Sequence, residues 1–179
     1  MWSVPESRRL AAELLGGADD RWPHVQRVAA AAEQLLELGG LGRSLHSAAW
    51  LHDIGYAPEL VHTGMHAIDG ALFLDRVGAP VEIVSLVAFH TGAEFEAEER
   101  GLIDTLAQFD RPAQEELDLL ILADLVSGSS GERVTVAKRF DGIFSRYEPQ
   151  HPVYRAVTRS RPYLEECAKR AAARVGYPM

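Results

Sequence analysis

The chain has 179 residues, of which 47% are hydrophobic and 25% are charged, an ordinary composition for a soluble globular protein with a sizeable core. Its formal net charge of -8 argues against binding to a long nucleic acid, because contacts to a phosphate backbone need a basic surface. A small anionic substrate stays open, since a metal centre can supply positive charge locally.

Apolar residues recur with helical spacing along most of the chain. This spacing predicts helices over residues 21–38, 43–53, 66–77, 81–90, 114–127, 132–147, 152–159 and 162–175. Residues 81–90 are rich in β-branched residues and also fit a strand, but their helical surroundings favour a buried helix. Residues 127–133 read as a loop, and residues 90–101 as a connection that contains a short acidic helix. The pattern predicts an all-α fold.

Signals for export or membrane insertion are missing from the sequence. The N-terminal stretch has no long apolar run, and no segment approaches the length that spans a bilayer. The only cysteine, Cys167, cannot form an intramolecular disulfide and has the neighbours of a small core residue. No repeat or long linker divides the chain. We therefore expect a cytoplasmic protein with one domain over residues 1–179 and no membrane partner.

Polar residues interrupt several of the apolar helix faces. Six of them have side chains of metal-binding type: His24, His52, Asp53, His66, His90 and Asp124. A single inward histidine is usually a satisfied core residue, whereas a buried carboxylate costs several kcal/mol unless it is paired or bound to metal. Arg139 or Arg146 could pair with Asp124. A shared metal site explains the whole set, because imidazole and carboxylate bind iron, manganese, zinc and related divalent ions.

The adjacent pair His52 and Asp53 needs a special geometry to reach one ion. Neighbouring residues of a helix point about 100° apart and normally diverge. At a helix end beside Gly55, both side chains can lean past the last turn. The sequence therefore predicts that the helix over 43–53 ends at this pair, and that the glycine turns the chain away.

The motif His-Asp-Ile-Gly at residues 52–55, with His24 before it and Asp124 after it, resembles the HD-domain superfamily of metal-dependent phosphohydrolases. His66 and His90 resemble the extra histidines of its HDIG-type branch, which has a binuclear metal centre. The small bacterial diadenosine-tetraphosphate hydrolases have a similar pattern.

The resemblance implies a helical bundle with the metal site at its centre. It covers a metal-binding core at about residues 20–127 and leaves a helical C-terminal extension at 132–175. The first metal would be held by His24, His52, Asp53 and Asp124. Asp53 would bridge to a second metal that His66 and His90 complete. Where several binuclear members carry two adjacent histidines, this chain departs from the pattern and has His90-Thr91.

Two divalent transition metal ions, such as iron or manganese, suit hydrolysis of a phosphate ester or anhydride by a metal-bound hydroxide. The expected partner is a nucleotide or another small phosphorylated metabolite, and a homodimer is allowed. Asp53 is then catalytic, and His62, in the loop before His66, is a candidate acid or substrate contact. Arg139 and Arg146, two turns apart on one predicted helix face, are candidates for binding phosphate, or else ordinary surface arginines.

Two other functions fit the same residues. A di-iron centre with these ligand types can activate dioxygen, so an HD-type oxygenase is the first alternative. A non-catalytic metal-binding sensor is the second, and the complete ligand set disfavours it.

Overall fold

The computed structural model describes residues 2–17, 20–39 and 42–178. These residues form α-helices and short 3₁₀ segments, and they contain no β-strand beyond an isolated bridge between Ser127 and Arg133. The α-helices are α1 (Val4–Leu15), α2 (Arg21–Glu37), α3 (Arg43–Leu51), α4 (His66–Arg76), α5 (Val81–Phe89), α6 (Ala93–Arg100), α7 (Ile103–Leu106), α8 (Gln114–Leu125), α9 (Val136–Phe144) and α10 (Pro152–Val175). The 3₁₀ segments are η1 (Ile54–Tyr56), η2 (Pro58–Leu60) and η3 (His90–Gly92). The predicted all-α fold is confirmed.

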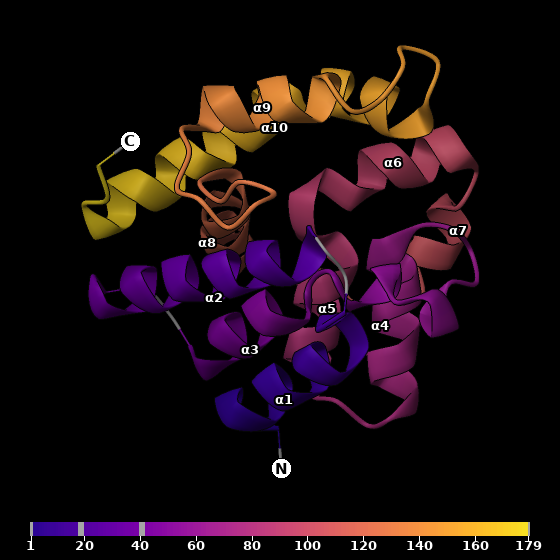
Figure 1. The fold of residues 1–179 in the computed structure, drawn as a ribbon, viewed down its shortest axis with the longest axis horizontal. Coiled ribbons are helices and arrows are strands. Elements are labelled where there is room, and N and C mark those ends of the chain that lie inside the picture. The colour runs from indigo at the N-terminus through magenta and orange to yellow at the C-terminus, as the bar shows by residue number, and fades with distance from the viewer. Residues whose placement is uncertain (1, 18–19, 40–41, 179) are drawn as a thin grey trace.

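The centre of the bundle is formed by α3, α5 and α8. Helices α9 and α10 lie along one side of the molecule, at the top of Figure 1, and α1 lies on the opposite side. Helix α8 packs against α2 and α10, and α3 packs against α1, α2 and α5. All residues of α5 from Ile83 to Phe89 and of α8 from Leu117 to Leu125 are buried. Polar groups on such helices enter the interior of the protein, where they need partners.

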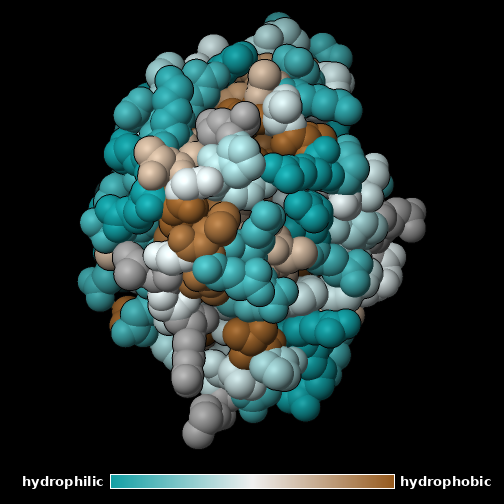
Figure 2. All heavy atoms as spheres, turned by 90° about the vertical axis from the view of Figure 1, so that its left-hand side faces the viewer, coloured by the Kyte–Doolittle hydropathy of each residue, from teal (hydrophilic) through white to brown (hydrophobic). Residues whose placement is uncertain are grey.

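The surface of the molecule mixes polar and apolar residues. On the face shown in Figure 2, the hydrophobic patches are small and lie between hydrophilic side chains. In the part of the chain that the structure describes, no helix combines the length and hydropathy of a membrane span.

Most predicted helices are present. The segments 21–38, 66–77, 81–90 and 114–127 form α2, α4, α5 and α8, and the short acidic helix within 90–101 is α6. Helices α1 and α7 were not predicted. Helix α1 begins at a capping box, in which the Ser3 hydroxyl accepts from the Glu6 amide and the Glu6 carboxylate accepts from the Ser3 amide.

The prediction of two helices at residues 152–159 and 162–175 is wrong, because α10 continues through Pro162. A proline inside a helix removes one hydrogen bond and normally breaks the helix. Pro162 lies on the exposed side of α10, whereas Val157, Ser160 and Leu164 on either side of it are buried. Packing of this continuous buried stripe holds the helix together across the proline.

The predicted helix at 132–147 is shorter than expected. The Val134 amide donates to the Val126 carbonyl at 3.0 Å, which keeps residues before Thr135 in an extended turn. The Thr135 hydroxyl then caps α9 by accepting from the Lys138 amide. Because α9 ends at Phe144, Arg146 lies beyond the helix and not on the same helix face as Arg139.

The glycine of the motif at 52–55 acts by its small size. Helix α3 ends at Leu51, two residues before the predicted end, and Gly55 lies within η1 without a positive φ. A Cβ atom on Gly55 would lie 2.0 Å from the His66 carbonyl oxygen and 2.7 Å from the Gly70 nitrogen. Gly55 therefore permits direct backbone contact between η1 and α4, and the prediction that it turns the chain is corrected.

Replacing Gly55 with alanine should lower the free energy of unfolding by about 3 kcal/mol, because backbone atoms of α4 cannot yield as a flexible side chain can. Chemical denaturation of the purified variant measures this change. The matched control is Gly142→Ala in α9, where a Cβ meets no atom within 4 Å. That variant should be stabilised by up to about 1 kcal/mol. Equal stability of the two variants would contradict the close approach.

Candidate metal centre

The six predicted donor residues meet around the carboxylate of Asp53. They come from separate elements: His24 from α2, His52 and Asp53 from the turn after α3, His66 from the start of α4, His90 from the end of α5, and Asp124 from α8. Five of these residues are buried, and His66 is partly exposed. Residues up to 100 positions apart in the chain thus share one small volume.

The first group of donors contains His24, His52 and Asp53, which can converge on one ion. The Nε2 atom of His24 lies 3.8 Å from Asp53 Oδ2, and that of His52 lies 3.6 Å from Asp53 Oδ1. Asp124 joins this group through its Oδ1 atom, which is 3.1 Å from His24 Nε2. Donor atoms at these separations are close enough to bind one metal ion placed between them.

The second group contains Asp53, His66 and His90. The Nε2 atoms of His66 and His90 lie 3.5 and 3.8 Å from Asp53 Oδ1, and 3.1 Å from each other. Asp53 belongs to both groups. A carboxylate placed in this way can bridge two cations.

Hydrogen bonds orient three of the imidazole rings toward this centre. The Nδ1 atoms of His52 and His90 face the Ala49 and Val87 carbonyls at 2.8 and 2.6 Å. His24 Nδ1 faces the carbonyl of Gly128 at 3.1 Å. Because a carbonyl can only accept, each Nδ1 carries a proton, and in the neutral ring Nε2 keeps its lone pair for the centre.

The residues present fit a bound metal ion. His52 Nε2 is buried and has no hydrogen-bond partner among the described residues. An unpaired buried nitrogen of this kind is unfavourable by about 1–3 kcal/mol. Its lone pair points to the place where His24 and Asp53 also present donor atoms. A divalent cation there satisfies the nitrogen and offsets the buried carboxylate.

The protonation states of His52, His66 and Asp53 suit metal binding. Burial lowers the pKa of His52 to about 4 and that of His66 well below its ordinary value, so both rings are neutral at pH 7. Burial also opposes a charge on His90, yet the Asp53 and Asp124 carboxylates raise its pKa. Burial alone would raise the pKa of Asp53, but His52 and Arg21 hold it well below the ordinary range. Asp53 is therefore an ionised donor.

Asp124 has the arginine partner that the sequence allowed. Burial favours its neutral form, but Arg139 and His24 hold its pKa well below the ordinary value. Arg139 Nη2 donates to Asp124 Oδ1 at 2.9 Å and lies 3.2 Å from His24 Nε2. Arg139 also lines the cleft described below, so it can contact a ligand in the cleft as well as pair with Asp124.

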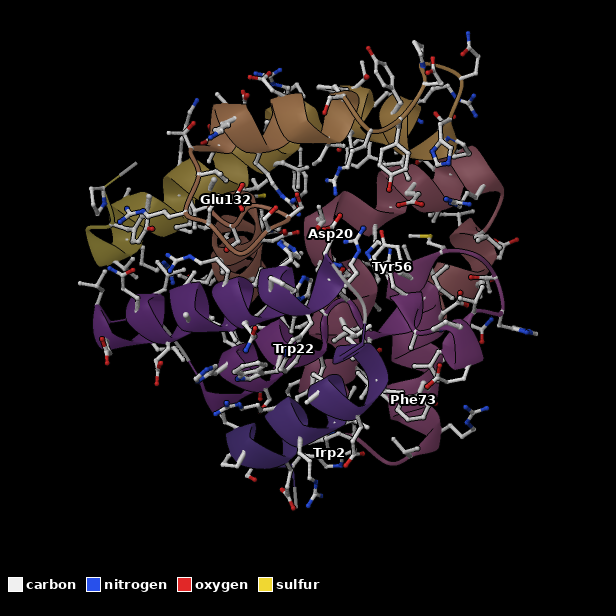
Figure 3. All side chains as sticks on the ribbon, viewed as in Figure 1. Trp2, Asp20, Trp22, Tyr56, Phe73 and Glu132 are labelled. Carbon is white, nitrogen blue, oxygen red and sulfur yellow. The ribbon has the colours of Figure 1, made fainter. Side chains whose placement is uncertain are left out.

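A stack of three side chains next to Asp53 was not predicted. The Arg21 guanidinium lies 3.8 Å from the centre of the Tyr56 ring, and the Tyr56 ring stacks on His66 at 4.2 Å. Arg21 also donates to Asp53 Oδ2 at 2.9 Å. Figure 3 shows Tyr56 beside the first turn of α2. The spacing of Arg21 and His24, three residues apart on one helix face, was the available signal.

A cleft opens from the donor groups to solvent between the helices that carry them and the C-terminal helices. One wall includes Arg21, Asp53, Tyr56, His66, His90 and Asp124. The other wall, from α9, α10 and the turn between them, includes Arg139, Ile143, Arg146, Tyr147, Val153 and Val157. Both predicted phosphate-binding arginines therefore face the cleft.

His62 does not take part in this arrangement. It is exposed and is not among the residues that line the cleft, so a role as acid or substrate contact has no geometric support. The loop around it is fixed by Asp69, which was not predicted. Its carboxylate accepts from the amide and hydroxyl of Thr63 at 2.8 Å and from the Gly64 amide at 3.1 Å. These bonds place the start of α4, and hence His66, and leave His62 on the outside.

Replacing Asp69 with alanine should lower the free energy of unfolding by about 2–3 kcal/mol, because three hydrogen bonds to one buried carboxylate are lost. Thermal or urea unfolding measures the change. Asp75→Ala, at an exposed position of the same helix, is the matched control and should change stability by less than about 0.5 kcal/mol. Similar losses in both variants would show that the loop does not depend on Asp69.

Comparison with known proteins identifies the family of the chain. Residues 21–128, more than half of the chain, match the HD domain. No curated protein and no solved structure matches the chain significantly. The matched segment begins at Arg21 and ends just after Asp124, so it contains all six donor residues but not α9 or α10. The chain belongs to the HD domain family.

Proposed function

We propose that this protein is a metal-dependent phosphohydrolase acting on a small phosphorylated metabolite, of which a nucleotide is one example. The observation that carries the proposal is the position of Asp53, shared by two groups of donors at the wall of a cleft that arginines also line. His24, His52, Asp53 and Asp124 would hold one divalent ion, and Asp53, His66 and His90 a second. Iron or manganese suits this donor chemistry.

When bound, divalent ions at these donors would make water a stronger nucleophile at neutral pH and offset the charge of the phosphoryl oxygens. The side chains of the protein provide the rest. Asp53 stays ionised at neutral pH because the Arg21 guanidinium, which donates to its Oδ2 atom, helps to hold its pKa down. The Nδ1–H group of His52 donates a hydrogen bond to the Ala49 carbonyl, and this bond keeps the ring oriented toward the site.

Arg146 is the best-placed cation for binding a phosphoryl group. It lines the cleft and, among the described residues, has no carboxylate partner, its Nε atom donating to the Gly142 carbonyl. Burial and the neighbouring charges of Arg139 and Arg21 lower its pKa. A bound dianion would relieve this repulsion, which supports phosphate as the recognised group.

The organic part of the substrate would contact the wall formed by α9 and α10. Ile143, Val153 and Val157 give this wall an apolar character next to Arg146. An apolar wall with a few charged groups is typical of sites for small molecules. The same wall lies outside the segment that matches the HD domain, so substrate choice is proposed to depend on residues beyond that segment.

The reaction type can be tested with a panel of phosphorylated metabolites and manganese, iron, cobalt or nickel, under air and under nitrogen. Hydrolysis predicts release of inorganic phosphate at the same rate under both atmospheres. Turnover that consumes oxygen and requires iron would replace this proposal with the di-iron oxygenase. Absence of bound metal after gentle purification, and after addition of each ion, would favour a protein without metal chemistry.

Asp53→Ala should abolish metal binding at both groups and lower turnover by about a thousandfold or more, because both groups share this carboxylate. His66→Ala should weaken only the second group. Metal content per chain, measured after dialysis against a defined concentration of Mn²⁺, distinguishes the two results.

The matched control for these variants is His62→Ala, which removes an exposed imidazole four residues from His66. Its metal content and rate should equal those of the parent. Full metal content in Asp53→Ala would overturn the site, and unchanged stoichiometry in His66→Ala would indicate a single ion.

A further inference from the structure

The turn between α5 and α6 contains an unusual backbone conformation. Thr91 has φ 54° and ψ 30°, and Gly92 follows with φ 70° and ψ 40°, so two consecutive residues are left-handed. Thr91 is the only non-glycine residue with positive φ in the part of the chain that the structure describes. This conformation is uncommon for any residue with a Cβ atom and is a clear outlier for a β-branched one.

Local structure does not account for a threonine at this position. Glycine would adopt the same backbone without strain, as it does at Gly92. The hydroxyl does not cap the following helix, because α6 has no side-chain hydrogen bond at its N-cap. A strained residue that persists usually has a side chain with a specific task.

The Thr91 hydroxyl donates to Oδ2 of Asp124 at 2.6 Å. This is a short hydrogen bond to an ionised group, of the stronger kind. The other oxygen of the carboxylate, Oδ1, lies 3.1 Å from His24 Nε2 and accepts from Arg139 at 2.9 Å. With Oδ2 engaged by Thr91, Oδ1 is the oxygen that faces the first donor group.

The same turn also carries a donor of the second group. His90, the residue before Thr91, places its Nε2 atom 3.8 Å from Asp53 Oδ1. Adjacent side chains of one turn thus reach both donor groups. The left-handed backbone at Thr91 follows an extended residue, His90 with φ -59° and ψ 155°, and this combination allows both side chains to point into the protein.

We infer that Thr91 is a positioning residue for Asp124: its hydroxyl holds Oδ2, so that the carboxylate presents Oδ1 alone to an ion shared with His24, His52 and Asp53. The inference rests on the proposed metal site and adds to it the group that fixes the orientation of Asp124. Hydrogen bonds of this kind to metal ligands contribute about 10–100-fold to metal affinity.

Three substitutions separate the hydroxyl from the backbone conformation. Thr91→Val keeps the shape and the strain but removes the hydroxyl; Thr91→Ser keeps the hydroxyl; Thr91→Gly removes both the hydroxyl and the strain. The dissociation constant for Mn²⁺ and the midpoint of thermal unfolding in EDTA are measured for each purified protein. These measurements do not depend on catalytic activity.

Thr91→Val and Thr91→Gly should bind one Mn²⁺ ion about 10–100-fold more weakly, whereas Thr91→Ser should bind it like the parent. Thr91→Gly should also unfold at a higher temperature in EDTA than Thr91→Val. The inference is overturned if Thr91→Val binds Mn²⁺ like the parent, or if Thr91→Ser is as weak as Thr91→Val.

The Mn²⁺ affinity of Asp124→Asn distinguishes an error in the role of Thr91 from an error in the proposed metal site itself. Loss of Mn²⁺ affinity in Asp124→Asn with parental affinity in Thr91→Val would remove only the role of Thr91. Parental affinity in Asp124→Asn would show that Asp124 is not a ligand, and would overturn the site and the role of Thr91 together.

Discussion

The structure depends on one ionised carboxylate, Asp53, at the centre of a helical protein. A carboxylate in this position would be unfavourable by several kcal/mol without compensation. Arg21 donates to one of its oxygens, and the Nε2 atoms of three histidines lie 3.5, 3.6 and 3.8 Å from the other. The helices that supply these groups are separate in sequence, so the need to surround this charge explains why their ends meet at one place.

The same arrangement of histidine and backbone occurs at the ends of two helices. His52 follows α3 and His90 follows α5, and each bonds through Nδ1 to the carbonyl three residues earlier. The last carbonyls of a helix have no partner within the helix. One hydrogen bond therefore satisfies a free carbonyl, fixes the tautomer of the ring and directs Nε2 to the centre. This is a physical reason for placing donors at helix ends rather than in helix interiors.

The helical pattern and the donor set could be predicted because both depend on spacing along the chain. The period of apolar residues marks α2, α4, α5 and α8, and polar residues on those faces mark the interior. Contacts between distant segments could not be predicted in this way. The stack of Arg21 on Tyr56 and the bond of Thr91 to Asp124 link residues 35 and 33 positions apart, and no periodicity reports them.

Two predictions from local sequence, at Pro162 and at Gly55, are wrong because contacts between distant segments override them. Proline predicts a helix start, yet the buried stripe of α10 continues through Pro162 because packing outweighs the lost hydrogen bond. Glycine predicts a turn, yet the position of Gly55 requires glycine for another reason: the backbone of α4 lies too close to leave room for a Cβ atom. In both cases a contact between distant segments determines the local backbone structure. A single sequence does not show which segments will be in contact.

The two walls of the cleft differ in what substitutions they can accept. The donors come from α2, α4, α5, α8 and the turn after α3, and all of them except His66 are buried. Helices α9 and α10 present one side to the cleft and another to solvent. A change at Ile143 or Val157 would alter the shape of the cleft while Asp53 and its histidines keep their partners. The donor groups and most of the apolar wall thereby lie in different layers of the fold, which Arg139 of α9 connects through its bond to Asp124.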